Sequence, residues 1–236
     1  MKIIFNADDF GLSKGVNFGI IDAYENGLVR SATIMANMPG FDHGVSLWKS
    51  SPGLKIGVHL VLTSGVSLGD SYKTITDGGS NFLNQATIFQ RAKDSELDLS
   101  EIEKEFTLQI DKILAAGIPI THFDGHHHVQ TLPGVADIVT RLAERHGVAV
   151  RAFGNSPTFD GTFYGEAATI SQLEHILSTC TENMEIMCHP AYLDSFLYNN
   201  SSYNIHRMKE LDVLVDPRAK VLVEKYGHTL SSFADL

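Results

Sequence analysis

The stretch KIIFNADDFGLSKGVNFGIIDAYENG (residues 2–27) contains one complete strand–turn–helix unit. Residues 2–7 are a short apolar run typical of a β-strand, and they are followed by Asp and Gly, which favour a turn. Beyond Ser13, the side chains of Val16, Ile20, Ala23 and Tyr24 share one helical face, and we expect that helix to end near Gly27. This unit predicts a fold in which strands alternate with helices.

The same alternation continues along the chain. Further strands are predicted over residues 31–38, 54–63, 119–125, 148–153 and 184–190. Helices are predicted near residues 40–50, 100–117, 133–145, 170–180, 204–214 and 217–226. Ser100 and Glu103 form a capping-box pattern, and Pro133 suits the first position of a helix. Residues 64–98 and 154–168 are rich in Gly and polar residues, so we expect long inserted loops there.

Strand–helix repetition favours an α/β protein with a parallel sheet, either barrel-like or doubly wound. Polar residues follow the first, third, fourth and sixth predicted strands, and in a (β/α) barrel such residues meet at the C-terminal mouth of the strands. We therefore expect a (β/α) barrel, regular or else distorted or incomplete, with its long loops at that mouth. Because no Pro- or Ser-rich linker divides the chain, we expect residues 1–236 to form a single domain.

The composition indicates which classes of partner and which cellular environment are disfavoured. The formal net charge is −10, and an acidic surface disfavours nucleic acid and anionic membranes. No apolar run approaches the length of about 18 residues that a membrane span requires. The chain has two cysteines, Cys180 and Cys188, which argues against a disulfide framework. The early Asp8 and Asp9 interrupt any export signal, so we expect a cytoplasmic protein.

Four short motifs carry the residues that could do chemistry. They are NADDFG (6–11), GVHL (57–60), DGHHHVQ (124–130) and MCHPAY (187–192). Each has an ordinary structural explanation, because an Asp pair before Gly favours a turn and a lone strand His is usually a core residue. Together they are better explained by convergence, since one barrel would place all four at a single mouth.

Side-chain direction selects among the histidines of the third motif. In an extended chain, His122, Asp124, His126 and His128 share one face, so His126 and His128 are expected to converge on a site and His127 to be structural. Imidazole pairs with a carboxylate and open positions suit a divalent metal in a hydrolase. The donor set is compatible with Zn, Mn, Co, Ni or Mg.

The adjacent residues Asp8 and Asp9 can take different roles in a metal-dependent hydrolysis. One can ligate the metal while the other takes a proton from water. His189, at the end of the predicted sixth strand, would then act as the general acid for the leaving group. The adjacent Cys188 is expected to be a small buried residue.

The motifs NADDFGLSKGVNFGI, IGVHLVLTSG, THFDGHHHVQ, FYGE and EIMCHPAYLD resemble the YdjC-like carbohydrate deacetylases, in particular the chitooligosaccharide (diacetylchitobiose) deacetylases. The resemblance covers essentially the whole chain. It implies a (β/α) barrel that removes N-acetyl groups from acetylated sugars such as chitin-derived disaccharides, with Mg²⁺ as cofactor and a homodimeric assembly.

The resemblance also implies roles for individual residues. Asp9, His59 and His126 match the metal ligands, and Asp8 matches the general base. His189 matches the acid of the more distantly related polysaccharide deacetylases, and Arg151 would lie near the base by the same comparison. Substrate contacts are predicted for His128, Arg151 and Tyr192.

Gln130 stands where the family commonly has a histidine, which leaves the metal site intact but puts an identical substrate contact in doubt. Two other functions remain open at this point. One is a different barrel metallohydrolase, either an amidohydrolase or a phosphoesterase. The other is a sugar-binding module without turnover.

Overall fold

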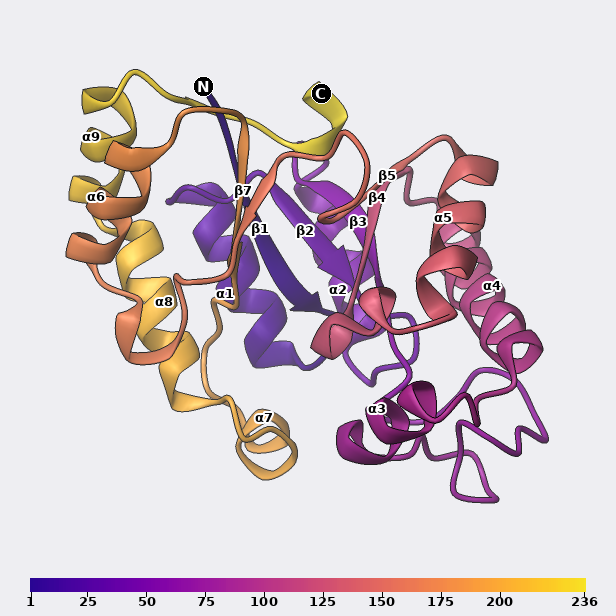
Figure 1. Cartoon of the computed structure of the whole chain (residues 1–236). Helices are drawn as coiled ribbons and strands as arrows, with labels where there is room; N and C mark the ends of the chain where they lie inside the picture. Colours follow the sequence, from indigo (N-terminus) through magenta and orange to yellow (C-terminus); the bar gives the residue numbers. More distant parts are fainter.

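A single parallel sheet organises the computed structural model, which describes all 236 residues (Figure 1). The strands run in the order β5-β4-β3-β2-β1-β7-β6, and β8 pairs with the beginning of β1. Their bounds are β1 Lys2–Phe10, β2 Ser31–Ile34, β3 Lys55–Leu60, β4 Ile120–Gly125, β5 Ala149–Val150, β6 Thr158–Asp160, β7 Met184–Cys188 and β8 Thr229–Leu230. The edge strands β5 and β6 do not pair with each other. The sheet is therefore a curled half-barrel, which confirms the predicted α/β class and the incomplete form of the barrel.

Helices flank this sheet on both sides (Figure 1). Helices α4 and α5 contact each other beside β3 and β4, whereas α6 and α9 form a second pair and α8 packs on α1. The helices are α1 Lys14–Glu25, α2 Phe41–Ser50, α3 Gln85–Lys93, α4 Leu99–Ala115, α5 Val135–His146, α6 Ile170–Thr179, α7 Ser195–Asn200, α8 Ile205–Val215 and α9 Pro217–Lys225. Three short 3₁₀ segments, η1 His126–Thr131, η2 Gly165–Ala167 and η3 Phe233–Asp235, complete the structure.

The core explains why the strands are so apolar. A parallel sheet covered by helices buries both faces of its strands, so each strand reads as a nearly continuous hydrophobic run. In β1, every residue from Ile3 to Phe10 is buried. A cluster of 57 buried apolar residues joins the sheet to its helices, and this packing fixes the strand ends that carry the site.

Four sequence predictions need correction. The region expected to be a loop over 64–98 contains α3, and the one over 154–168 contains β6. Helix α4 begins one residue early, because the Asp98 carboxylate accepts a hydrogen bond from the Ser100 backbone and so caps the helix in place of Ser100. Pro133 does not begin α5, because Gly134 has a φ of 74° and the helix starts only at Val135.

None of the helices combines the length and the hydropathy needed to cross a bilayer.

Candidate active site

The two adjacent aspartates of β1 reach the same cavity because the strand is irregular at this point. In a regular strand, neighbouring side chains point to opposite faces. Asp9 instead has a φ of 70°, and the register between β1 and β2 shifts between Ala7 and Phe10, as in a β-bulge. Asp tolerates this left-handed conformation better than most residues. Asp8 and Asp9 therefore both line one cavity.

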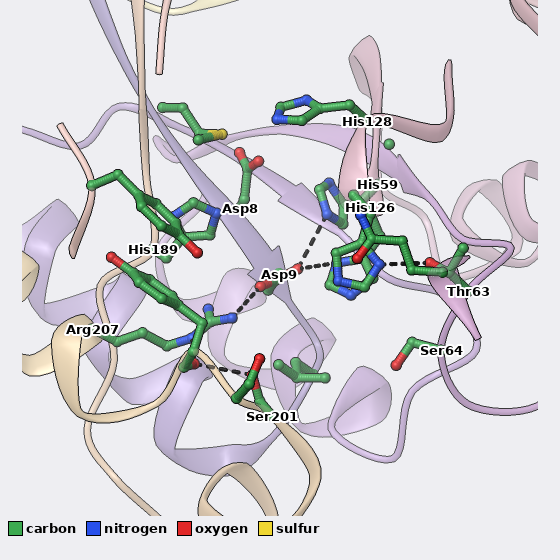
Figure 2. Close-up of a pocket in the computed structure, with 18 of the residues that line it drawn as sticks. Asp8, Asp9, His59, Thr63, Ser64, His126, His128, His189, Ser201 and Arg207 are labelled. Carbon is green, nitrogen blue, oxygen red and sulfur yellow. Dashed lines mark hydrogen bonds and ion pairs between the residues drawn. The ribbon is translucent and has the colours of Figure 1, made fainter. Parts of the chain in front are cut away.

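That cavity has a volume of about 620 Å³ and lies at the carboxyl ends of the central strands (Figure 2). It brings together residues from all four sequence motifs. Its titratable lining residues are Asp8, Asp9, His59, His126, His127, His128, His189, Tyr164, Tyr203 and Arg207. Neutral polar residues complete most of the wall, namely Thr63, Ser64, Asn84, Gln85, Asn200, Ser201 and Ser202. A cavity of this size and polarity suits a small polar ligand.

Asp9, His59 and His126 form a cluster with the chemistry of a metal site (Figure 2). Asp9 Oδ1 lies 2.9 Å from His126 Nδ1 and 3.1 Å from His59 Nε2. The buried His59 Nε2 atom makes no hydrogen bond, and its contact with Asp9 leaves it available as a ligand atom. One carboxylate and two imidazoles within reach of a common point fit a divalent cation.

Asp124 orients His59 for this task. His59 Nδ1 lies 2.7 Å from Asp124 Oδ1, and Asp124 Oδ2 accepts a hydrogen bond of 2.9 Å from the Thr33 hydroxyl. Burial opposes a charged imidazole, but the Asp124 carboxylate outweighs it and raises the pKa of His59 to about 10. A carboxylate that holds Nδ1–H directs Nε2 at the cluster, where a cation would take the place of the Nε2 proton, as in the carboxylate–histidine pairs of metalloenzymes.

Arg207 of α8 holds the other oxygen of Asp9. Its NH2 group lies 2.6 Å from Asp9 Oδ2, and its Nε donates to the Tyr203 carbonyl at 2.6 Å. Burial opposes ionisation of Asp9, but Arg207 and the two histidines together hold its pKa well below the usual range. Asp9 is therefore ionised, with Oδ2 engaged by Arg207 and Oδ1 directed at the histidines.

Arg151 engages Asp8 from behind the cavity. The guanidinium makes two hydrogen bonds to Asp8, of 2.6 and 2.7 Å, and its Nε donates to Glu185 at 2.8 Å. Burial opposes ionisation of Asp8, but the charge of Arg151 outweighs it and lowers the pKa of the Asp8 carboxyl. Arg151 is 0% exposed and does not line the cavity, so it contacts Asp8 rather than the space open to a substrate.

His189 and Tyr192, predicted from the last motif, lie in different places. His189 lines the cavity, and its backbone N–H donates to the buried Glu210 carboxylate. Its Nδ1 lies 3.7 Å from Glu210 Oε2, which is too long for a hydrogen bond. Tyr192 is exposed, donates its hydroxyl to Asp22 of α1, and does not line the cavity.

The histidine run departs from the extended geometry assumed for it. The strand ends at Gly125, and His127 and His128 have φ values of 54° and 58° inside η1. Because of this turn, His126, His127 and His128 all line the cavity, including His127, which we expected to be structural. The Thr63 hydroxyl and His127 Nδ1 lie 2.9 Å apart. The fourth histidine, His122, is instead fully buried and stacks on Phe233.

Sequence reasoning missed three supporting residues. Arg207 and Glu210 lie in a segment that reads only as an amphipathic helix, and Glu185 lies within a strand. Glu185 gave the one available signal, because it is a charged residue in the otherwise apolar strand β7 and a buried charge requires a partner.

Fold and site together define a class. The protein is a parallel α/β half-barrel whose strand ends carry a carboxylate and imidazole cluster suited to a divalent cation. Comparison with known proteins identifies the family: the model of the YdjC-like protein family matches residues 2–225, and the chain belongs to that family.

Individual relatives agree with this assignment. The chain is 39% identical over 248 residues to Carbohydrate deacetylase 1 of Listeria innocua, with full coverage of both chains. It resembles a crystal structure from Enterococcus faecalis proposed to be a cellobiose-phosphate cleavage protein, with a TM-score of 0.89, 26% identity, and coverage of 99% of this chain and 98% of that one.

A more distant neighbour shares the fold alone. It is a family 4 acetyl xylan esterase from Clostridium thermocellum in complex with a cobalt ion. The TM-score is 0.56 at 12% identity, and the alignment covers 100% of this chain and 89% of that chain.

Proposed function

We propose that this protein is a metal-dependent hydrolase that removes N-acetyl groups from acetylated carbohydrates, such as chitin-derived disaccharides or oligosaccharides, and releases acetate. One observation carries the proposal: Asp9, His59 and His126 surround a common point in a cavity that Asp8 and His189 also line. The relative named carbohydrate deacetylase supports the reaction, and the neighbour that binds cobalt supports the use of a divalent cation.

Five residues of the cavity have roles in the proposed amide hydrolysis. Asp9, His59 and His126 would hold the cation, whose Lewis acidity polarises the acyl oxygen and lowers the pKa of water. Asp8 is ionised and can accept the proton of the attacking water, while Arg151 fixes the direction of its two oxygens. His189 would donate a proton to the amine nitrogen as the C–N bond breaks.

The cavity wall supports a carbohydrate as the substrate. Hydroxyls and amides on its wall match the hydroxyl groups of a sugar, and His128 adds a neutral imidazole because burial lowers its pKa. Magnesium as the native cation and the homodimer stay predictions from the family resemblance, and the cytoplasmic location stays a prediction from the N-terminal sequence.

A phosphoesterase is less well supported by the same wall. Arg207 is the one Lys or Arg that lines the cavity, and it is already bound to Asp9. A phosphoester would therefore meet a single guanidinium that is already paired with Asp9 through its NH2 group and has only its NH1 group unpartnered.

Mass spectrometry of diacetylchitobiose incubated with the protein and Mg²⁺, Zn²⁺ or Co²⁺ tests the reaction. We expect the loss of one acetyl mass per turnover. Asp8→Asn should reduce turnover at least about 100-fold while leaving cation binding in place, as expected for loss of a general base. Asp111→Asn, the same change on the exposed face of α4, is the matched control. If no cation supports acetate release, the hydrolase assignment is wrong and a sugar-binding module becomes the better reading.

A further inference from the structure

The Arg207 guanidinium has one donor group that the protein itself does not use. Its NH2 group pairs with Asp9 Oδ2 at 2.6 Å, and its Nε donates to the Tyr203 carbonyl at 2.6 Å. The NH1 group has no hydrogen-bond partner, although Arg207 is only 2% exposed. Buried donors nearly always have a partner, and leaving a charged one unpaired is especially costly. The NH1 group is therefore open to a single hydrogen-bond acceptor from a ligand.

This open donor belongs to the wall of the candidate active site. Arg207 lines the cavity of about 620 Å³. The Asp9 carboxylate joins it to the metal cluster, because Oδ2 faces Arg207 while Oδ1 faces the two histidines. Figure 2 shows Arg207 and His189 on one side of Asp9, with His59 and His126 on the other. A group that spans the cavity from the cluster to His189 therefore passes beside the guanidinium.

An acceptor that carries negative charge suits this donor best. An arginine guanidinium stays protonated in proteins, so its free N–H groups offer charge-assisted hydrogen bonds. The guanidinium of Arg207 is held in place by its bonds to Asp9 and to the Tyr203 carbonyl, and its central carbon lies 5.3 Å from the centre of the Tyr203 ring. A donor fixed in this way can stabilise developing charge without first reorganising. In amide hydrolysis, the atom that acquires such charge is the acyl oxygen.

We propose that Arg207 is a further catalytic residue, whose NH1 group donates a hydrogen bond to the acyl oxygen of the substrate. This role rests on the proposed function and adds a residue that the proposed reaction does not yet use. As water attacks the acyl carbon, a C–O bond forms and the C=O π electrons move onto the acyl oxygen, while Asp8 accepts the proton of the water. Arg207 keeps its own protons and stabilises the negative charge. When the electron pair re-forms C=O, the C–N bond breaks and His189 supplies a proton to the amine nitrogen.

Arg207→Lys tests this contact by kinetics. The lysine ammonium keeps the charge and can pair with Asp9, but it lacks the planar fork that holds a second oxygen in a fixed position. With diacetylchitobiose at saturating cation, we expect kcat to fall about 100-fold or more and KM to change less than about threefold, as for loss of one oxyanion donor. If Arg207 only positioned Asp9, the variant would bind the cation more weakly but keep its kcat once the cation is saturating. Arg145→Lys, at an exposed position on α5, is the matched control and should leave kcat unchanged.

Two binding measurements with acetate do not depend on turnover. Acetate presents the same acyl oxygens, so the cation-loaded wild type should bind it at least about tenfold more tightly than Arg207→Lys in a calorimetric titration. A crystal structure of the wild type with cation and acetate needs no variant, and it decides the contact if Arg207→Lys fails to fold. We expect an acetate oxygen within about 3.2 Å of the Arg207 NH1 atom.

A wild-type kcat in a folded Arg207→Lys protein at saturating cation would overturn the proposal. Equal acetate binding by the two proteins would also overturn it, as would a bound acetate with no oxygen in reach of Arg207 NH1. Failure of the proposed function has a different signature, namely no acetate released from the sugar by the wild type with any cation. In that event the titration and the crystal structure decide whether NH1 binds an acyl oxygen, and a wild type that binds no acetate overturns the contact.

Discussion

Replacement of Asp124 by Asn tests how the metal site is oriented without removing a metal ligand. Asp124 Oδ2 receives a hydrogen bond from Thr33 and lies 3.0 Å from the Arg151 guanidinium. Both neighbours are donors, so the carboxamide of the Asp124→Asn variant must turn its oxygen toward them and its NH2 group toward His59 Nδ1. His59 Nδ1 then has to accept, and its proton moves to Nε2, the atom that would bind the cation.

Loss of such a carboxylate partner typically weakens metal binding about 10- to 100-fold, which corresponds to about 1.4–2.7 kcal/mol. Isothermal titration with Zn²⁺ or Co²⁺ at one fixed pH measures the change directly. Asp111→Asn on α4 is the matched control, and thermal melts followed by circular dichroism establish that each variant is folded. A folded Asp124→Asn protein that binds the cation within about threefold of wild type would refute the orienting role of Asp124.

Three further predictions concern the cation and the buried carboxylates. Exhaustive chelation should abolish acetate release and a divalent cation should restore it; full activity after chelation contradicts a metal-dependent reaction. Glu105→Gln should lower the free energy of unfolding in urea by about 1–3 kcal/mol, because the buried Glu105 accepts hydrogen bonds from the backbone N–H groups of Leu68 and Gly69. An unchanged free energy of unfolding would contradict a stabilising role for these hydrogen bonds. Burial raises the pKa of Glu185 from 4.5 to about 7, so the folded protein binds a proton more tightly than the unfolded chain and loses stability as pH rises between these values. Over that pH range the free energy of unfolding should fall less for Glu185→Gln than for the wild type. If urea unfolding gives the same pH dependence for both proteins, the raised pKa of Glu185 is contradicted.

The sequence alone determined the architecture and the five cavity residues that have roles in the proposed function. Apolar runs of strand length alternate with amphipathic helical patterns, and this periodicity reflects local burial, which any chain segment reveals by itself. The sequence pattern also predicted five site residues at strand ends, namely Asp8, Asp9, His59, His126 and His189. The structure brings all of them to one cavity. The coarse site follows from topology, because parallel strands end at the same edge of the sheet.

Local signals were weakest where a single residue changed the geometry. Gly134 delays the start of α5 despite the favourable Pro133, and Asp98 takes the capping role predicted for Ser100. The left-handed residues His127 and His128 turn the chain out of the extended form, so the alternation of faces fails after Gly125. Each is a choice between conformations of similar energy, which surrounding contacts decide.

Tertiary structure alone decided how the charged groups of the site are paired. Arg207 reaches Asp9 from 198 residues away, and Arg151 reaches Asp8 from 143 residues away. Neither ion pair can be recognised from the hydrophobic periodicity of the sequence, because a buried ion pair depends on which side chains meet after the sheet and helices have packed. The bulge at Asp9 belongs to the same category, since the register shift against β2 lets two adjacent aspartates share one cavity. Sequence patterns record what each segment buries, whereas the orientation of a buried charge is set by the distant groups that solvate it in place of water.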